Sequence, residues 1–265
     1  MVSVGAGMQY HAITLEHSDG VAVITLNRPE RMNSLNTLMR SEICAAFEKM
    51  GTEARVIVLT GAAPAFCAGQ DLADGGNAAD LDLEAVLRDE YVPMLNAIYD
   101  CPVPTIAAVN GAAVGAGANL ALACDVVMAA ESAYFTQAFT KIALIPDAGG
   151  TYYLPRQIGL ARAMGAALFA DKISAAQARD WGMIYETALD ADFEAHWRKR
   201  ATQLAQGPSQ TYGLVKEALR ASLNNTLEEQ LALEARLQGE AGKTRDFREG
   251  VQAFLEKRAP KFEGR

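Results

Sequence analysis

Cysteine and histidine are scarce in this sequence, and their spacing forms no metal-binding or disulfide pattern. Four cysteines and three histidines are spread over 265 residues, without a CxxC pair. This spacing argues against a Cys/His metal site and against a disulfide-stapled secreted fold. We therefore expect free thiols in a reducing cytoplasm. Residues 1–9 also lack the length and the basic start of a signal peptide.

Positive charge is in short supply as well, and other common signals are missing. The formal net charge is -8 and the pI is about 5.0, which argues against nucleic acid as a partner. The apolar run 106–130 contains Asn110, Asn119 and Asp125, so we interpret it as buried core and expect no membrane association. GxGxxG is absent, because Gly115-Ala-Gly117 is followed by Leu120, which disfavours a dinucleotide-binding fold.

What the sequence does contain is an alternation of short apolar strands and helices. A hairpin is predicted over 11–26 and buried strands over 56–60, 103–109 and 125–130. Helices are predicted over 34–50, 83–99, 161–169 and from 174 to Trp181, and a loop over 74–82. Four further helical patterns cover 192–206, 208–223, 227–240 and 245–258. The alternation predicts an α/β fold with both faces of the sheet covered.

The segment Ile145-Pro-Asp-Ala-Gly-Gly-Thr151 carries the best candidate for chemistry. It is typical of a turn that opens a helix, with Pro146 fixing its own φ and the two glycines allowing close approach. Asp147 is the one carboxylate in these otherwise apolar surroundings. Burial without a cation would raise its pKa and make it a usable acid or base. A capping aspartate is the commoner role of an Asp before glycines.

Two small-residue turns, Ala68-Gly69-Gln70 and Gly115-Ala116-Gly117, follow the strands 56–60 and 103–109. Backbone N–H groups at such turns are available to a ligand. Two converging donors would form an oxyanion hole for a thioester carbonyl that becomes an enolate. The alternative is that small residues only permit close packing of helix and strand.

Four motifs in order resemble those of the crotonase, or enoyl-CoA hydratase/isomerase, superfamily. They are Leu26-Asn-Arg-Pro-Glu-Arg-Met-Asn-Ser-Leu35, Phe66-Cys-Ala-Gly-Gln-Asp-Leu72, Asn110-Gly-Ala-Ala-Val-Gly-Ala-Gly-Ala118 and Arg248-Glu-Gly-Val-Gln-Ala-Phe-Leu-Glu-Lys-Arg258. The resemblance implies a spiral of ββα units over 1–195 that binds acyl-CoA. It also implies a helical oligomerisation region over 196–265, in a homotrimer or a dimer of trimers.

Carried over by motif, the resemblance places the two oxyanion N–H donors on Gln70 and Ala116. Ala68 would border the adenine of CoA, Arg28 and Met32 would line its outer path, and Lys257 from a neighbouring helix would meet its phosphates. No separate cofactor is implied, since CoA is part of the substrate.

The departures from the family pattern concern the acids. Hydratases of the family carry two glutamates that handle water, and the motif alignment puts Asn119 and Phe139 at these positions. Neither side chain can donate or accept a proton usefully. Asp147 stands where isomerases of the family carry a catalytic aspartate. Phe139 and Leu144 would keep water away from it.

A second set of segments resembles the branch of the superfamily that isomerises ring-1,2-epoxyphenylacetyl-CoA to oxepin-CoA in phenylacetate degradation. They are Phe66-Cys-Ala-Gly-Gln-Asp-Leu72, Ala138-Phe139, Leu144-Ile-Pro-Asp-Ala-Gly-Gly-Thr151, Leu154-Pro-Arg156, Arg162-Ala-Met164 and Trp181-Gly-Met-Ile184. Tyr152, Tyr153 and the loop 74–82 would then shape an aromatic acyl pocket, although core packing is the commoner role of such tyrosines. Three alternatives stay open. They are an aliphatic enoyl-CoA double-bond isomerase, a dehalogenase that uses the aspartate as nucleophile, and a non-catalytic subunit that binds acyl-CoA.

Overall fold

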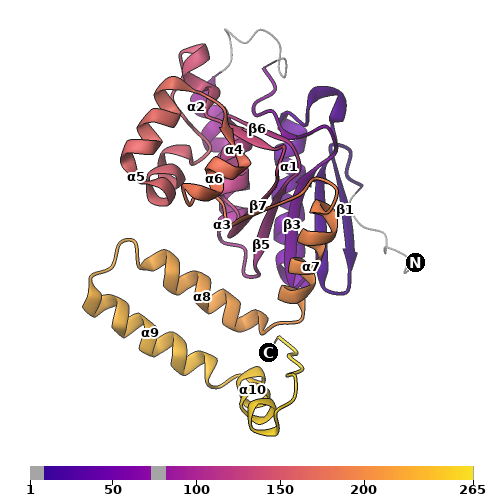
Figure 1. The fold of residues 1–265 in the computed structure, drawn as a ribbon, viewed down its shortest axis with the longest axis vertical. Helices are drawn as coiled ribbons and strands as arrows, with labels where there is room; N and C mark the ends of the chain where they lie inside the picture. The colour runs from indigo at the N-terminus through magenta and orange to yellow at the C-terminus, as the bar shows by residue number, and fades with distance from the viewer. Residues whose placement is uncertain (1–8, 73–81, 265) are drawn as a thin grey trace.

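Two β-sheets form the centre of the fold (Figure 1). The computed structural model describes residues 9–72 and 82–264. In this part of the chain, the six-stranded sheet has the order β1 (Ile13–Ser18), β2 (Val21–Leu26), β3 (Val56–Gly61), β5 (Thr105–Val109), β7 (Val126–Ala130) and β10 (Glu186–Ala188). The four-stranded sheet has the order β4 (Ala65–Cys67), β6 (Ala112–Val114), β8 (Tyr134–Thr136) and β9 (Ile173–Ser174).

Consecutive strands alternate between the two sheets, and this alternation produces the predicted spiral of ββα units. The pairs β3–β4, β5–β6 and β7–β8 each place their first strand in the larger sheet and their second in the smaller. Within the smaller sheet β4, β6 and β8 are parallel neighbours. The carboxyl ends of these three strands therefore lie side by side. The α/β class and the crotonase-like fold are confirmed.

Helices follow the strand pairs and cover the sheets. They are η1 (Pro29–Arg31), α1 (Thr37–Glu53), α2 (Leu83–Val86), the π-helical turn η3 (Leu87–Tyr91), α3 (Val92–Tyr99), α4 (Ala116–Leu122), η4 (Ala138–Ile142), α5 (Gly150–Phe169) and α6 (Ala175–Asp180). Asn36 caps α1 by accepting from the Met39 N–H at 2.9 Å, as its position before the apolar pattern predicts. The predicted helix 83–99 is continuous but contains the π turn.

Two features differ from the expectations. Helix α5 begins at Gly150, eleven residues before the predicted start at 161, because Pro155 and Gly159 interrupt the helical pattern in the sequence. Gly159 has non-helical angles, so α5 consists of two helical halves. The strands β4, β6 and β8 are absent from the prediction, since three residues are too few to show a period. Most of the predicted loop 74–82 lies outside the described residues, as do residues 1–8.

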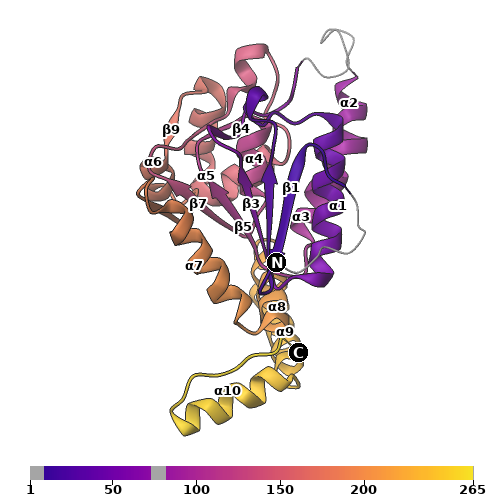
Figure 2. The same ribbon diagram turned by 90° about the vertical axis from the view of Figure 1, so that its right-hand side faces the viewer.

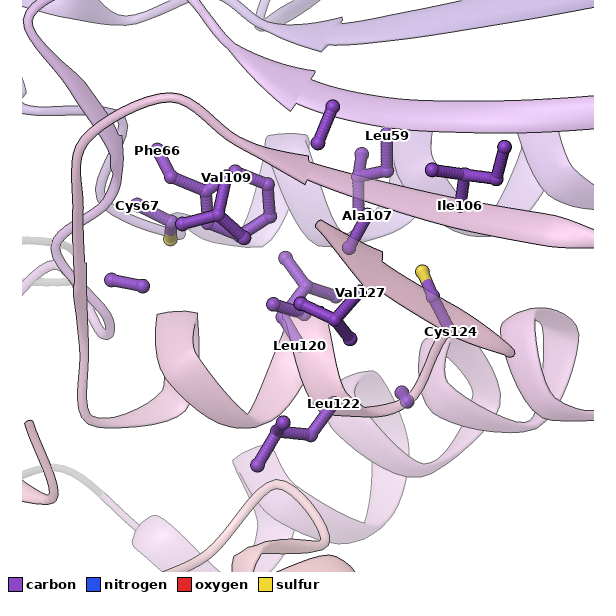
Figure 3. Packing of buried hydrophobic residues seen from close by; sticks show 14 of the residues in the cluster. Leu59, Phe66, Cys67, Ile106, Ala107, Val109, Leu120, Leu122, Cys124 and Val127 are labelled. Atoms are coloured by element: carbon purple, nitrogen blue, oxygen red, sulfur yellow. The ribbon is translucent and has the colours of Figure 1, made fainter. Parts of the chain in front are cut away.

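The main core lies between the sheets and the helices. β5 and α4 are buried at every position. Figure 3 shows part of this packing, in which apolar side chains of β3, β5 and β7 meet Leu120 and Leu122 of α4. A rigid core directly behind β4 and β6 fixes the turns that follow these two strands. Across the described residues, no helix is both long and apolar enough to span a bilayer.

The C-terminal helices extend away from the sheets (Figures 1 and 2). Helix α7 (Phe193–Ala205) crosses the predicted boundary at 195/196 and contacts β2, β3 and β7, whereas α8 (Ser209–Ala221), α9 (Leu227–Ala241) and α10 (Arg245–Glu256) form an arm. Lys216 and Arg220 tie α8 to the core through Asp125, each at 2.7 Å. The arm exposes large apolar side chains such as Phe254 and Leu255. Its role in oligomerisation stays a prediction.

Candidate active site

A cavity of about 250 Å³ lies at the carboxyl ends of β4, β6 and β8. Its lining residues come from the segments 68–72, 114–116 and 138–144, from the helical segment 83–91, and from Asp147. Most of them are apolar. The cavity therefore brings together Ala68, Gln70, Ala116 and Asp147, four of the predicted site residues, from three separate parts of the sequence.

The backbone at Gln70 presents an N–H group to this cavity. The carbonyl oxygen of Gly69 accepts a hydrogen bond from the Leu35 N–H at 2.7 Å. In a trans peptide the C=O and the N–H point in opposite directions. The Gln70 N–H shares this peptide with the Gly69 carbonyl, so it points away from Leu35 and toward the cavity that Gln70 lines.

The Ala116 N–H is the second donor. Ala116 is the first residue of α4, and the Gly115 carbonyl in the same peptide accepts from the Asn119 N–H at 3.2 Å. The Ala116 N–H therefore points out of the helix N-terminus, where backbone donors have no partner within the helix. A Cβ built on Gly69 would lie 3.4 Å from the Ala116 nitrogen. The two turns are thus close enough to hold one oxygen between them.

Glycine is required where α4 meets β4. A Cβ on Gly117 would overlap the carbonyl group of Cys67, the last residue of β4. Gly69 has a φ of +91°, which side chains disfavour, and a Cβ there would lie 2.7 Å from the Val114 oxygen. The absence of side chains thus lets the two turns approach. Both suggested roles of the small residues, close packing and free N–H groups, are compatible here.

Asp147 places a carboxyl group against the cavity. Burial raises the pKa of Asp147 from 3.8 to about 6, although a hydrogen bond from its own backbone works in the opposite direction. Its Oδ1 is buried and has no hydrogen-bond partner among the described residues. An unpaired carboxylate oxygen in a low-polarity site is available to take a proton from a ligand.

Asn119 holds the turn that carries Asp147. This fully buried side chain donates from Nδ2 to the Asp147 carbonyl oxygen at 2.8 Å and accepts from Gln137 Nε2 at 2.8 Å. A Cβ on Gly150 would overlap the Asn119 amide, and Gly149 has a φ of +82°. Gly149 therefore allows a backbone conformation that side chains disfavour, and Gly150 allows the chain to approach Asn119 closely.

Phe139 and Leu144 lie in the cavity wall, as predicted. The Phe139 ring faces the oxyanion turn, since a Cβ on Gly115 would lie 3.7 Å from it. Tyr152 and Tyr153 do not line this cavity. They line a separate hollow near Tyr99 and α8. Their predicted role in the acyl pocket is therefore wrong.

Two cavity-adjacent residues escape sequence reasoning. Tyr91 lines the cavity, and its hydroxyl donates to Gln70 Oε1 at 2.6 Å. Arg40, buried in α1, donates to the same Gln70 oxygen at 2.9 Å. Both lie within helical apolar patterns and look like core positions in the sequence. The sequence feature that could have identified Arg40 is a positively charged residue at a position that the helical pattern places on the buried face of the helix.

The remaining predicted CoA contacts lie outside the cavity wall. The Met32 carbonyl accepts from the Ala68 N–H at 3.0 Å, so Met32 borders the site at Ala68. Arg28 is engaged within the chain, in an ion pair of 2.9 Å with Asp71. Lys257 ends α10, on the arm far from the cavity (Figures 1 and 2). Its predicted contact with CoA therefore stays a prediction.

Comparisons with known proteins agree with this geometry. Residues 16–265 match the enoyl-CoA hydratase/isomerase family. The chain belongs to this family, whose members act on acyl-CoA thioesters. A Rhodobacter capsulatus protein named "probable enoyl-CoA hydratase" is 64% identical over 97% of this chain and 100% of its own length. The 1,2-epoxyphenylacetyl-CoA isomerase of Escherichia coli is 46% identical over 93% of this chain and 96% of its own.

Solved structures of the enoyl-CoA hydratase/isomerase family share the fold. The crystal structure of an enoyl-CoA hydratase from Bacillus anthracis superposes with a TM-score of 0.89 at 34% identity, covering 96% of this chain and 100% of that one. Membership makes the acyl-CoA enzyme class secure. The printed names of the relatives include both hydratases and isomerases, so the reaction has to be argued from the residues of this chain.

Proposed function

We propose that this protein is an acyl-CoA isomerase that moves a proton with Asp147 while Gln70 and Ala116 hold the thioester oxygen. One observation carries the proposal. Asp147 is the one carboxylate among the described residues of the cavity wall, and its Oδ1 is buried and unpaired. One carboxylate of raised pKa is what a proton shuttle needs.

The reaction requires no atom beyond those of the substrate. Ionised Asp147 takes a proton from the carbon next to the thioester carbonyl, and the electron pair of that C–H bond moves into an enolate. The N–H groups of Gln70 and Ala116 stabilise the enolate oxygen, each by roughly 3 kcal/mol on the precedent of other oxyanion holes. Asp147 then returns the same proton to a conjugated carbon, which shifts the double bonds.

Hydration by two carboxylates is disfavoured at this site. Asn119 and Phe139 stand where hydratases of the family are expected to carry their two glutamates. Asn119 is committed to the Asp147 turn, and Phe139 presents a ring to the cavity. Neither can activate water. The apolar wall also protects an enolate from protonation by solvent.

For the acyl group we propose ring-1,2-epoxyphenylacetyl-CoA, converted to oxepin-CoA. In this conversion the C–C bond between the two epoxide carbons breaks as the ring expands to the oxepin, and a proton moves from the carbon next to the thioester to a ring carbon, so that no atom is gained or lost. The proton shift is the step just described. Most side chains in the cavity wall are aromatic or aliphatic, apart from Gln70, Lys141 and Asp147. Leu72, Leu83 and Ile142 are partly exposed at its edge. The 46% identical isomerase from Escherichia coli supports this substrate.

The proposal also covers the assembly. CoA would be bound as part of the substrate, without a separate cofactor, along Ala68, Met32 and Arg28. Lys257 would reach its phosphates from a second copy in a trimer or a dimer of trimers. The four cysteines are free thiols, which suits the cytoplasm as the compartment.

Product analysis after turnover tests the reaction. Wild type, Asp147→Asn and the surface control Asp180→Asn are incubated with ring-1,2-epoxyphenylacetyl-CoA and, separately, with a cis-3-enoyl-CoA. We expect wild type and control to convert the epoxide without adding water, and Asp147→Asn to bind it without reaction. Conversion of the aliphatic substrate alone would keep the mechanism and change the substrate. A 3-hydroxyacyl product, or full activity of Asp147→Asn, would contradict the proposal.

A further inference from the structure

Arg40 is a buried cation that the chemistry described above does not use. Its side chain is 1% exposed in the first turn of α1. The guanidinium donates to Glu90 Oε2 from Nε at 2.9 Å and from Nη2 at 2.6 Å. Burial of an arginine is costly unless the charge is paired and its N–H groups are bonded. Because burying Arg40 costs free energy, the contacts that its guanidinium makes next to the cavity are important.

Arg40 holds the backbone next to the oxyanion hole from two directions. Its Nη1 donates to Gln70 Oε1 at 2.9 Å and to the Leu35 carbonyl oxygen at 2.7 Å. The backbone of Leu35 is bonded to the turn 68–70 and its flank. Its N–H donates to the Gly69 oxygen at 2.7 Å, and its carbonyl oxygen accepts from the Asp71 N–H at 3.0 Å. The peptide that carries the Gln70 N–H is therefore fixed through the Gln70 side chain and through Leu35.

The partner Glu90 belongs to the opposite wall. It lies in the π-helical turn η3, where Leu87 and Tyr91 face the cavity. Tyr91 donates its hydroxyl to the same Gln70 oxygen as Arg40, and the Arg40 guanidinium lies 4.9 Å from the centre of the Tyr91 ring. The segment that lines the acyl side of the cavity is thus tied to the oxyanion turn through one ion pair.

We propose that Arg40 and Glu90 are a positioning pair that aligns the Gln70 N–H with the thioester oxygen and couples this alignment to the wall at 87–91. This inference rests on the proposed function, since it assumes that the Gln70 N–H binds the thioester. Neither side chain touches the substrate. Glu90 and Arg40 link the wall at Tyr91, against which the acyl group would pack, to the peptide that carries the Gln70 N–H.

The test separates alignment from folding. Phenylacetyl-CoA carrying ¹³C at the thioester carbonyl is bound to each protein, and isotope-edited infrared spectroscopy measures the carbonyl stretch. The variants are Arg40→Lys and Glu90→Ala, with Asp89→Ala as the matched control on the same turn. Asp89 is 60% exposed and pairs with Arg88 at the surface. Glu90→Ala removes the partner that is itself 27% exposed, so it keeps the test informative if Arg40→Lys folds poorly.

We expect wild type and Asp89→Ala to lower the carbonyl frequency on binding, and the two pair variants to lower it less. Their kcat for the acyl-CoA that wild type isomerises should fall roughly ten- to hundred-fold, with KM changed less than about three-fold. Arg40→Lys, which keeps one charged donor, should lose less than an Arg40→Met variant. Folded variants with wild-type kcat and carbonyl frequency would overturn the pairing role. A wild type whose bound carbonyl frequency does not move would instead refute the oxyanion hole, and with it the proposed function.

Discussion

The side-chain amide of Asn119 donates to the main-chain oxygen of Asp147 at 2.8 Å, which ties helix α4 to the turn of the candidate acid. Asn119 lies in α4, one turn beyond the donor Ala116. The same short helix therefore carries the N–H group that we propose for the oxyanion hole and fixes the turn that bears the carboxyl group. A position where hydratases of the family are expected to place a glutamate has here become part of the scaffold.

Substitution of Asn119 by leucine should damage both stability and turnover. The change leaves the Asp147 carbonyl and Gln137 Nε2 without their partner in a buried place. We expect the free energy of unfolding to fall by about 2–4 kcal/mol. We also expect kcat to fall ten-fold or more, because the Asp147 turn loses its anchor. Urea denaturation and steady-state kinetics on the same preparations measure the two effects.

Asn96→Leu is the matched control, since Asn96 is exposed on α3. It should stay within about 0.5 kcal/mol of wild type and keep its kcat. If Asn119→Leu keeps the stability and kcat of Asn96→Leu, the hydrogen bond between Asn119 and Asp147 contributes to neither, and other bonds hold the turn.

Gly150→Ala tests the close approach at the start of α5. A methyl group here overlaps the Asn119 amide, so either the turn or Asn119 has to move. We expect a loss of about 1–3 kcal/mol in stability and a drop in kcat with little change in binding of a saturated acyl-CoA. Thermal unfolding and calorimetric titration are the measurements.

Gly165→Ala serves as its control in the same helix. Nothing lies within 4 Å of a Cβ at Gly165, so the higher helix propensity of alanine should stabilise the protein by up to about 1 kcal/mol. If Gly150→Ala and Gly165→Ala have the same stability and kcat, the contact between Gly150 and Asn119 can adjust to a methyl group without cost.

Much of the site was predictable because it follows strand ends. Gln70 and Ala116 come from glycine-bearing turns after buried strands, and Asp147 stands out as a carboxylate in apolar surroundings. The parallel order of β4 and β6 was not predictable from their three residues each. That order is what brings the two turns so close that a Cβ on Gly69 would lie 3.4 Å from the Ala116 nitrogen.

Residues that act from within helices were less accessible. Tyr91 and Arg40 fit helical apolar patterns, and their meeting at Gln70 Oε1 depends on the packing of α1 against α3 and η3. Tyr152 and Tyr153 failed for a related reason. The sequence places them five and six residues after Asp147, but a helix turns successive side chains by about 100°, so proximity in sequence did not mean a shared cavity.

The activity should depend on pH through Asp147. Its pKa is raised to about 6 by burial, and the shuttle requires the ionised form. We expect kcat/KM to be constant above pH 7 and to fall about ten-fold by pH 5, since the acid limb reports the free enzyme. A profile that stays flat to pH 5 would show that Asp147 is ionised throughout or is not the base.

Stability should depend on pH through the same group, with a sign that follows from the direction of the shift. The folded protein holds the Asp147 proton with a pKa of about 6, against the ordinary value of 3.8 for an aspartate exposed to water. The favourable contribution of the protonated form is therefore complete below about pH 4 and is lost as the pH rises through about 6. At pH 8 the buried, ionised carboxylate destabilises wild type by on the order of 2 kcal/mol.

Asp147→Asn carries no charge, so its stability relative to wild type should rise by that amount between pH 4 and pH 8. Urea unfolding at matched protein concentration, with Asp180→Asn as the exposed control, measures the change. A difference between Asp147→Asn and wild type that is the same at both pH values would mean that Asp147 is solvated in the folded protein, and the apolar environment invoked for its basicity would have to be abandoned.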